Sequence, residues 1–369
     1  MFYKIKPLDT LFFRDGRPFS MGAETWANPI FPPYPSTIYG AIRTWLIFER
    51  GNLKDFEDGK FENELGRIIK DEKGDIKVKK GSLKMKGSLV ALNDILYFPV
   101  PKDLLKRKDK NEERLYSINL IKKPEILTSE YPLKNVLINK EEFELDEVDE
   151  FIDINSLKDY LKNSERILEY TDKEKIFKQE KKTGIKRSKK TLSSEEGHLY
   201  RIPMIRLEKG ASLFVEIEGL NSYPENGVIQ IGGEGKTAKI EKCSDLLESI
   251  RNLNFKFKNR MFKLYLATPA IFNKGWIPEW IEENFEGNYK EIKLRLISCS
   301  IGKYNLIGGW DLARKRPKPM YKAVPAGSVY YFEILDDTPA EKIKETFHLK
   351  NISDINPQEG FGLSLVGEM

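Results

Sequence analysis

Two glycine-containing segments carry residue types that can bind phosphate. GGEGKTAK (residues 232–239) contains Gly-Lys-Thr, and GFGLSLVG (residues 360–367) contains a Gly-x-Gly pair. A P-loop also needs a glycine five residues before Gly235, but Gln230 stands there, so a nucleotide triphosphatase is not expected. A dinucleotide-binding fingerprint needs a helix after its glycines, whereas LSLVGEM predicts a strand. The terminal glycines therefore indicate either a tight helix-to-strand turn or a loop that lets a ligand approach the backbone.

A second kind of chemistry lies in IGGWDLARKRPKPMYKAVPAGSVYYFEI (residues 307–334), where cations alternate with aromatic rings. Such a mixture suits unpaired RNA, because cations contact phosphates and flat rings stack on bases. Two prolines keep the segment extended. The cations that can contact phosphates are Arg314, Lys315, Arg316, Lys318 and Lys322, and the rings that can stack on bases are Trp310 and Tyr321.

The N-terminal part repeats this combination around a proline-rich turn. A helix that starts at Ser36 or Thr37 would offer free backbone N–H groups to an anion, with one of these side chains as its cap. Trp45, further along the same helix, is predicted to lie in the core. The arginines and aromatic residues of this region are Arg14, Arg17, Arg43, Phe19, Trp26, Tyr34 and Tyr39.

Other catalytic and metal-binding patterns are missing from the sequence. It holds two histidines, His198 and His348, and two cysteines, Cys243 and Cys299. It contains no His-Glu-x-x-His motif, no Gly-x-Ser-x-Gly motif and no cluster of Cys and His residues. We therefore predict no catalytic residue, no metal and no cofactor.

Charge is unevenly distributed along the 369 residues, whose net charge is +5. Residues 173–190 hold nine basic and two acidic residues, and residues 141–153 hold eight acidic residues and no basic one. Separation of this kind indicates electrostatically steered partners, although both runs could also be solvated insertions. No apolar run reaches the ~18 residues of a membrane helix, and MFYKIKPLDT lacks a signal-peptide core, so we predict a cytoplasmic protein without a membrane partner.

The periodicity of apolar residues predicts an α+β protein of two domains. FYKIKPLDTLFFR opens with the alternation of a strand, Asn93-Asp94 predicts a turn between two strands, and KGWIPEWIEENF predicts a short helix or a loop. From about residue 251 onward the expected order is strand, helix, strands, helix, strand, which is typical of a ferredoxin-like fold. Residues 1–250 show a looser version of that order, interrupted by charged insertions at about 52–80 and 102–180. We therefore predict tandem ferredoxin-like domains, 1–250 and 251–369, with a C-terminal glycine-rich loop.

Together, several segments resemble the RAMP proteins of type III-B CRISPR (Cmr) effector complexes, in particular the subunit that caps the 5′ handle of the CRISPR RNA. The resemblance rests on IKPLDTLFFRDGRPF, PPYPSTIYGAIRTWL, GWDLARKRPKPMYKAVPAGSVYYFEI and GFGLSLVG, supported by GIKRSKKTLSSEEGHLYRIPMIRL and IQIGGEGKTAKIE. It reaches both ends of the chain. The charged insertions match no pattern of this family.

The resemblance implies a non-catalytic, RNA-binding subunit in antiviral defence, built on ferredoxin-like (RRM-like) domains. Its implied partners are the crRNA 5′ handle, the large polymerase-like Cmr subunit and the adjacent backbone RAMP subunit, with target RNA reached through the complex. It also implies that the terminal glycine loop, including Gly367, approaches RNA, and that a thumb-like hairpin lies near 183–203, with its turn at SSEEG. Asn28 is among the polar residues expected to select the RNA sequence.

Residue chemistry and resemblance together give the predicted RNA-binding residues: Arg14, Arg17, Ser36, Thr37, Tyr39, Arg43, Lys186, Arg187, His198, Gly232, Gly233, Lys236, Trp310, Arg314, Lys315, Arg316, Lys318, Tyr321, Gly360 and Gly362. Two alternatives stay open. One is a metal-independent RNA-processing endonuclease of the RAMP superfamily, for which His198 is the candidate acid or base. The other is an adaptor that binds protein alone.

Overall fold

The computed structural model describes residues 1–14, 29–70, 76–110, 112–125, 131–164, 166–187, 194–311 and 314–369; of residues 70, 77, 184–187 and 194–201 it describes the backbone alone. The chain forms two compact units. Unit 1 comprises Met1–Ser88, Glu174–Ser244 and Leu306–Lys322, and unit 2 comprises Leu89–Lys173, Asp245–Asn305 and Ala323–Met369. The predicted domain boundary near residue 250 stays a prediction.

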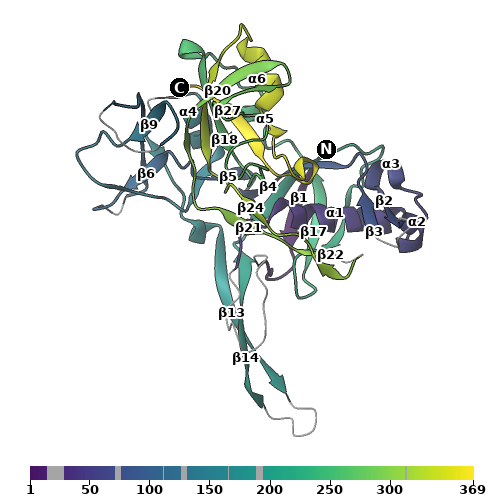
Figure 1. Ribbon diagram of the computed structural model, residues 1–369. Coiled ribbons are helices and arrows are strands. Elements are labelled where there is room, and N and C mark those ends of the chain that lie inside the picture. The colour runs from purple at the N-terminus through teal and green to yellow at the C-terminus, as the bar shows by residue number, and fades with distance from the viewer. Residues whose placement is uncertain are drawn as a thin grey trace. The chain divides into compact units, whose positions relative to one another are not determined.

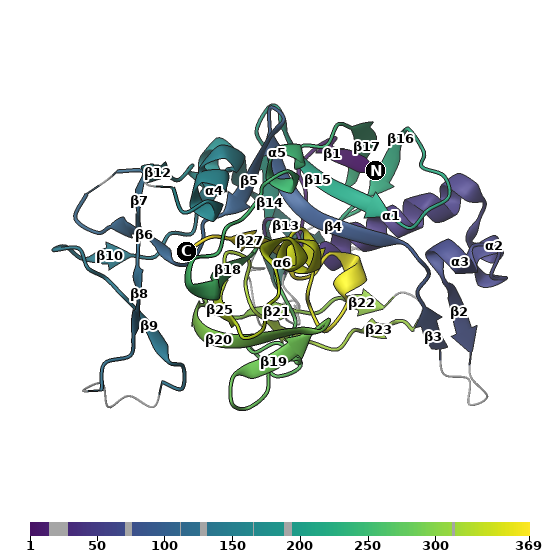
Figure 2. The same cartoon turned by 90° about the horizontal axis from the view of Figure 1, so that it is seen from above.

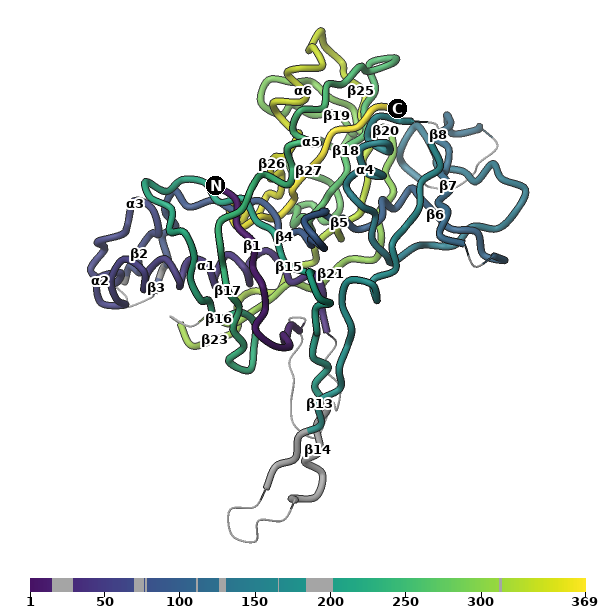
Figure 3. The backbone as a smooth tube through the Cα atoms, turned by 180° about the vertical axis from the view of Figure 1, so that it is seen from behind, coloured from purple at the N-terminus to yellow at the C-terminus, as the bar shows by residue number. Residues whose placement is uncertain are grey.

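Unit 1 is built on a sheet in which β4 (Lys84–Leu92), β15 (Ala211–Glu218), β1 (Phe2–Pro7), β17 (Thr237–Cys243) and β16 (Asn226–Gln230) lie in that order. The first strand, β1, lies between β15 and β17 and is antiparallel to both (Figure 3). Its alternating sequence places Tyr3 and Ile5 in the core, 1% and 0% exposed, as the period-2 pattern predicts. The predicted N-terminal strand is therefore confirmed.

Helix α1 (Pro35–Arg50) follows β1 and packs against the sheet with Ile38, Ile42 and Leu46, which recur at helical spacing. The helix begins one residue before the predicted capping pair. Its N-cap is Tyr34, which makes no side-chain cap hydrogen bond, and Pro35 occupies the first turn. The predicted cap at Ser36 or Thr37 is therefore wrong, because a proline already fixes the helix start.

The predicted insertion at 52–80 folds as part of unit 1. It forms α2 (Leu53–Glu57), α3 (Glu62–Leu65), β2 (Arg67–Lys70) and β3 (Ile76–Lys79). Two of its side chains, Phe56 and Leu65, are 3% and 0% exposed, so the segment adds to the core beside α1. The remaining strands of unit 1 form hairpins or pairs: β13 (Phe177–Arg187) with β14 (Ser194–Leu207), β22 (Trp310–Asp311) with β23 (Arg316–Pro317), and β21 (Asn305–Ile307) with β24 (Tyr321–Ala323).

Unit 2 contains a six-stranded sheet in the order β19 (Glu286–Tyr289), β20 (Ile292–Ser300), β25 (Val329–Ile334), β18 (Met261–Leu266), β27 (Leu363–Gly367) and β26 (Lys350–Asn351). Helix α6 (Ala340–Phe347) packs beside β27 (Figure 2). Phe262, Phe332 and Phe347 are each at most 1% exposed and join the sheet to this helix. Residues 267–285, between β18 and β20, are all described and contain no α-helix, which fits the loop alternative for KGWIPEWIEENF.

The rest of unit 2 comes mainly from the predicted insertion at 102–180. The turn Asn93-Asp94 joins β4 to β5 with φ of 49° and 65°, which confirms the turn predicted there. The remaining elements of this unit are β5 (Ile95–Pro99), β6 (Leu104–Arg107), β7 (Arg114–Ser117), β8 (Asn119–Lys122), β9 (Asn135–Ile138), β10 (Leu145–Asp146), β11 (Phe151–Asp153), α4 (Ile154–Leu161), β12 (Leu168–Glu169) and α5 (Glu248–Arg251).

The fold is thus mixed α/β, with mostly antiparallel sheets and few helices, which confirms the broad class predicted from the sequence. The finer prediction of tandem ferredoxin-like domains stays a prediction. None of the helices in the described ranges is long and apolar enough to cross a membrane.

Candidate nucleic-acid interface

The aromatic and basic segment at 310–322 forms a short hairpin with an exposed ring. Trp310 of β22 lies opposite Pro317 of β23, and Asp311 lies opposite Arg316. Because directly opposite residues of an antiparallel pair share a face, Pro317 flanks the indole. Trp310 is 57% exposed, which is unusual for so large an apolar ring. The hairpin therefore presents a flat ring on which a base could stack.

The predicted phosphate-binding cations of this segment fall into two groups. Lys315, Arg316 and Lys318 are exposed. Arg314 instead donates from Nε to the Ile76 carbonyl oxygen at 2.6 Å and pairs with Asp311 at 3.3 Å. Arg314 therefore holds the hairpin against β3, and the accessible cations are Lys315, Arg316 and Lys318, together with Lys322 of β24, which is also exposed.

Two predicted RNA-binding residues of α1 are engaged in packing. Tyr39 is 4% exposed, and its hydroxyl donates to the Leu83 carbonyl oxygen. Arg43 donates from Nε to the Leu65 carbonyl oxygen at 2.7 Å, with its guanidinium over the Phe56 ring. Both contacts involve residues near or within the segment at 52–80, whose folding the sequence did not predict. Trp45 is 7% exposed, which confirms its predicted place in the core.

The other predicted residues differ in how far they are exposed. Ser36 and Thr37 are half-buried in the first turn of α1, and Tyr321 of β24 is half-buried as well. Arg14 is exposed, and its backbone forms a bridge with Pro29. Arg17, Phe19, Trp26 and Asn28 lie outside the described residues.

The glycine turn between β16 and β17 packs against the segment that follows β1. The Gly233 N–H donates to the Phe12 carbonyl oxygen at 2.9 Å. Gly232 has φ of +74°, and a Cβ there would lie 2.4 Å from the same oxygen. These two glycines are therefore required by the close approach of two backbones. Their predicted RNA contact stays a prediction.

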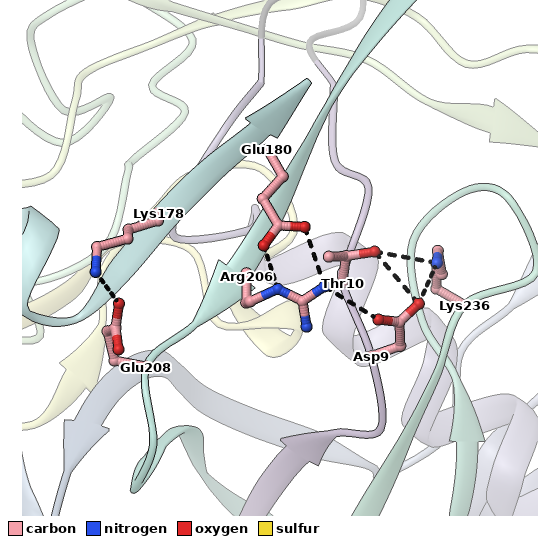
Figure 4. Close-up of polar contacts among 7 residues, drawn as sticks. All are labelled: Asp9, Thr10, Lys178, Glu180, Arg206, Glu208 and Lys236. Atoms are coloured by element: carbon pink, nitrogen blue, oxygen red, sulfur yellow. Dashed lines mark hydrogen bonds and ion pairs between the residues drawn. The ribbon is translucent and has the colours of Figure 1, made fainter. Parts of the chain in front are cut away.

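Lys236, in the same turn, belongs to a network of charges at the base of the β13–β14 hairpin (Figure 4). Its ammonium lies 2.9 Å from Oδ2 of Asp9 and donates to the Thr10 hydroxyl at 3.1 Å. The Arg206 guanidinium of β14 lies 3.5 Å from Oδ1 of Asp9 and donates two hydrogen bonds to the Glu180 carboxylate of β13. The hydrogen bond from Lys236 lowers the pKa of the Asp9 carboxyl to about 2. Sequence reasoning missed Asp9 and Arg206, because nothing local relates them to residue 236.

A hairpin of β13 and β14 covers the segment predicted as a thumb, 183–203, and is longer than that segment. Its role as a thumb stays a prediction. In Figure 1, β13 and β14 form a two-stranded ribbon that extends from the rest of unit 1. The expected turn at SSEEG is wrong, because residues 194–197 already belong to β14, with Ser194 opposite Arg187. Lys186, Arg187 and His198 lie in these strands, and their side chains are outside the described part of the structure.

The terminal glycine loop is buried and its backbone is engaged. Gly362 has φ of +71°, its N–H donates to the Pro269 carbonyl oxygen at 2.7 Å, and a Cβ there would lie 2.6 Å from the Ser353 nitrogen. Gly360 has φ of +102°, and its carbonyl oxygen accepts a hydrogen bond from Thr268. The first alternative, a tight turn into the last strand, therefore describes this geometry. RNA contact at this loop stays a prediction.

Unit 2 also holds a buried polar cluster that sequence reasoning did not find. The Asp103 carboxylate is 4% exposed and accepts hydrogen bonds from the hydroxyls of Tyr160 and Tyr331. Lys263 is 6% exposed, and its ammonium lies 3.5 Å from the centre of the Tyr160 ring. Burial lowers the pKa of Lys263 to about 8 and raises the pKa values of Tyr160 and Tyr331 well above 10.

His348 is buried, and both of its ring nitrogens contact the backbone. His348 is 5% exposed; its Nε2 contacts the Ile250 carbonyl oxygen, and its Nδ1 accepts from the Val366 N–H. Burial lowers its pKa to about 4, so it is neutral at pH 7. Within the part of the chain that the structure describes, no three His, Cys, Asp or Glu side chains converge as metal ligands.

Comparison with solved structures places the fold among Cmr proteins of type III-B CRISPR systems. A chain of the Type III-B Cmr-beta complex bound to cognate target RNA and AMPPnP matches with a TM-score of 0.50 and 16% identity, covering 90% of this chain and 86% of that one. A chain of the same complex bound to cognate target RNA matches with a TM-score of 0.50, 18% identity and the same coverage. At these identities the similarity concerns the fold alone.

The family follows from the sequence itself. The model of the CRISPR-associated protein (Cas_Cmr3) family matches residues 3–369, so the chain belongs to that family. The resemblance to a type III-B CRISPR RAMP protein is thereby confirmed. No curated protein matches the sequence.

Proposed function

We propose that this protein is a non-catalytic RNA-binding subunit of a type III-B CRISPR interference complex in the cytoplasm, where it binds the 5′ handle of the crRNA. In this proposal it docks the large polymerase-like subunit, abuts the adjacent backbone RAMP subunit and meets target RNA through the complex. Membership of the Cas_Cmr3 family supports the assignment to a CRISPR effector.

The observation that carries the proposal is the exposed face of the β22–β23 hairpin. Trp310 is 57% exposed beside exposed Lys315, Arg316 and Lys318. A ring for stacking with three cations for phosphates is the combination that binds unpaired RNA. Solved Cmr-beta complexes that contain a chain of similar fold are bound to cognate target RNA, which supports RNA as the ligand.

We also propose that each unit is a ferredoxin-like domain that has lost one helix. In the order of the chain, the four main strands of unit 1 are β1, β4, β15 and β17, and they lie in the sheet as β4-β15-β1-β17. Those of unit 2 are β18, β20, β25 and β27, and they lie as β20-β25-β18-β27. The same spatial order, second, third, first and fourth, supports two related domains. Helix α1 follows the first strand of unit 1, and α6 precedes the fourth strand of unit 2.

The non-catalytic part of the proposal draws on the two histidines. His348 is buried with both ring nitrogens engaged, so it is poorly placed for acid or base catalysis. His198 lies in β14, and a substitution tests whether it acts as a catalytic acid or base. Neither a His198→Ala variant nor the wild type should cleave a CRISPR repeat RNA. Cleavage by the wild type that the variant loses would establish the endonuclease alternative instead.

RNA binding by the full chain, alone and with its large-subunit partner, tests the proposal at two salt concentrations. The probes are guide RNAs with an intact 5′ handle, with a scrambled handle and without a handle. We expect tighter binding to the intact handle, with affinity falling as salt rises. Equal binding to all three probes would contradict handle recognition, and no binding at low salt, alone or in the complex, would favour the protein-binding adaptor.

A further inference from the structure

The Asp9 carboxylate lies between two cations that come from distant parts of the chain (Figure 4). Its Oδ2 is 2.9 Å from the Lys236 ammonium, and its Oδ1 is 3.5 Å from the Arg206 guanidinium. Each carboxylate oxygen therefore faces a different cation. This is the arrangement in which two cations hold the two unesterified oxygens of a phosphodiester.

Both cations are held in place by groups other than Asp9. Lys236 donates to the hydroxyl of Thr10, which is 6% exposed, and the Lys236 side chain itself is 17% exposed. Arg206 makes two hydrogen bonds to the Glu180 carboxylate across the hairpin. The site would therefore keep its cations if Asp9 turned away.

The backbone around the site is tied down in the same way. Leu11 and Ile205 exchange two backbone hydrogen bonds of 2.7 Å, which join the segment after β1 to β14. The N–H of Gly233 donates to Phe12, which joins that segment to the glycine turn. Arg206 and Lys236 therefore lie on elements that are fixed to one another through residues 11 and 12.

Asp9, by contrast, is the exposed member of the group. Its side chain is 60% exposed, and it follows β1 outside any strand. Exposed ion pairs contribute little net stability, because water replaces the partner at small cost. Asp9 can therefore leave the two cations without unfolding the site.

We propose that Arg206 and Lys236 form a binding site for a phosphodiester of single-stranded RNA, and that Asp9 occupies this site as an internal phosphate mimic until RNA displaces it. The charges balance in both states, because Arg206 and Lys236 face Glu180 together with either Asp9 or one phosphate. The inference rests on the proposed RNA-binding function and adds a second contact region, at the base of the β13–β14 hairpin, to the β22–β23 face.

The test compares two variants of the full chain that each remove one negative charge. Asp9→Asn keeps the shape of the side chain and loses the mimic. Glu225→Gln is the matched control, since Glu225 is 76% exposed and pairs with Lys242 in the same unit, away from the two cations. Affinity for RNA with an intact handle is measured across a salt series, and thermal unfolding checks that both variants fold.

We expect Asp9→Asn to bind RNA roughly 3- to 10-fold more tightly at low salt and to steepen the salt dependence by about 0.7 in log–log slope, the value for one added phosphate contact on a single strand. Glu225→Gln should change affinity by less than about 2-fold, because a screened distant charge acts weakly. Adding Lys236→Gln to Asp9→Asn should remove the gain. Equal effects of the two single variants, or weaker binding by a folded Asp9→Asn, would overturn the proposal.

Two further measurements apply if Asp9→Asn is less stable than the wild type or if the wild type binds no RNA. If Asp9→Asn lowers the unfolding temperature, Asp9→Ser takes its place, with the same expected gain and the same overturning result. If the wild type binds no RNA, the proposed function fails, and inorganic tripolyphosphate then tests the anion site alone. Tighter binding of tripolyphosphate by Asp9→Asn than by Glu225→Gln would support the site, and equal binding would dismiss it.

Discussion

Replacing Lys263 with methionine should stabilise the protein at neutral pH. Lys263 lies in β18 with 6% of its surface exposed, and its ammonium faces the Tyr160 ring at 3.5 Å. Burial lowers its pKa from 10.5 to about 8, even though Asp103 and Glu368 favour the charged form. The folded protein therefore holds a charge that its surroundings compensate incompletely.

The pKa difference sets the magnitude of the effect. A change from 10.5 to about 8 corresponds to roughly 3 kcal/mol against the charged amine in the folded state. Methionine has nearly the same length and no charge, so Lys263→Met should raise the free energy of unfolding by about 1–3 kcal/mol at pH 7, after the lost contact with the Tyr160 ring is subtracted.

The effect should depend on pH in a defined direction. Between pH 8 and 10.5 the folded protein has released the Lys263 proton while the unfolded chain still holds it. The unfolded state then binds more protons, so wild-type stability rises with pH from about 8 to about 10, and the advantage of methionine shrinks. Above about pH 10 the trend reverses, because Tyr160 and Tyr331 keep their protons in the folded state while unfolded tyrosines ionise.

Urea unfolding at pH 7 and pH 9.5, followed by two spectroscopic probes, measures both effects. Lys290→Met is the matched control, since Lys290 is exposed and its ammonium also lies over a tyrosine ring, that of Tyr289. The control should change stability by less than about 0.5 kcal/mol at either pH. A destabilised Lys263→Met protein at pH 7 would refute the reasoning and show that attraction to Asp103 and Tyr160 outweighs burial. A gain that is the same at both pH values would refute the lowered pKa of Lys263 as its cause.

Three other perturbations test the interface and the fold. Trp310→Ala should weaken RNA binding by about 1–3 kcal/mol. It should leave the unfolding temperature unchanged, because the ring is exposed. Loss of the folded spectrum in circular dichroism would assign the ring to the core instead. Combined Lys315→Ala and Arg316→Ala changes should flatten the salt slope of RNA binding by about 0.7 per lost phosphate contact on a single strand. An unchanged slope in filter binding would dismiss this hairpin as a backbone-contact site. Gly362→Ala should lower the free energy of unfolding in urea by about 1–3 kcal/mol, because φ is +71° and the new Cβ would meet the Ser353 nitrogen. An unchanged urea midpoint would contradict a packing role for this glycine.

The sequence predicted the features that depend on neighbouring residues. Alternation placed β1, and Asn93-Asp94 predicted a turn that the structure forms with positive φ at both positions. The stretch GWDLARKRPKP predicted a basic and aromatic surface, and Trp310 is indeed exposed. Each of these outcomes follows from residue type and from spacing within a few positions.

Features that depend on distant residues could not be predicted in the same way. Tyr39 and Arg43 carry the chemistry of an RNA site, but the charged segment at 52–80 folds beside α1 and engages Arg43 through Leu65 and Phe56. Lys236 pairs with Asp9, which precedes it by 227 positions. No local pattern reveals such partners, because they are set by which strands become neighbours in the sheet.

The interleaving of the two units has a consequence for synthesis of the protein. Unit 1 starts at Met1 but is complete only with Leu306–Lys322, and unit 2 ends with Ala323–Met369. A ribosome that has released residue 250 has therefore finished neither unit, although every strand of the sheet that contains β1 has emerged. Residues 89–173 of unit 2 must wait for the six-stranded sheet, whose strands all follow residue 260. A recombinant fragment that ends near residue 250 would expose Leu133 and Tyr160, which are 2% and 3% exposed beside that sheet in the whole chain. The whole chain is therefore the smallest unit expected to express in a soluble form.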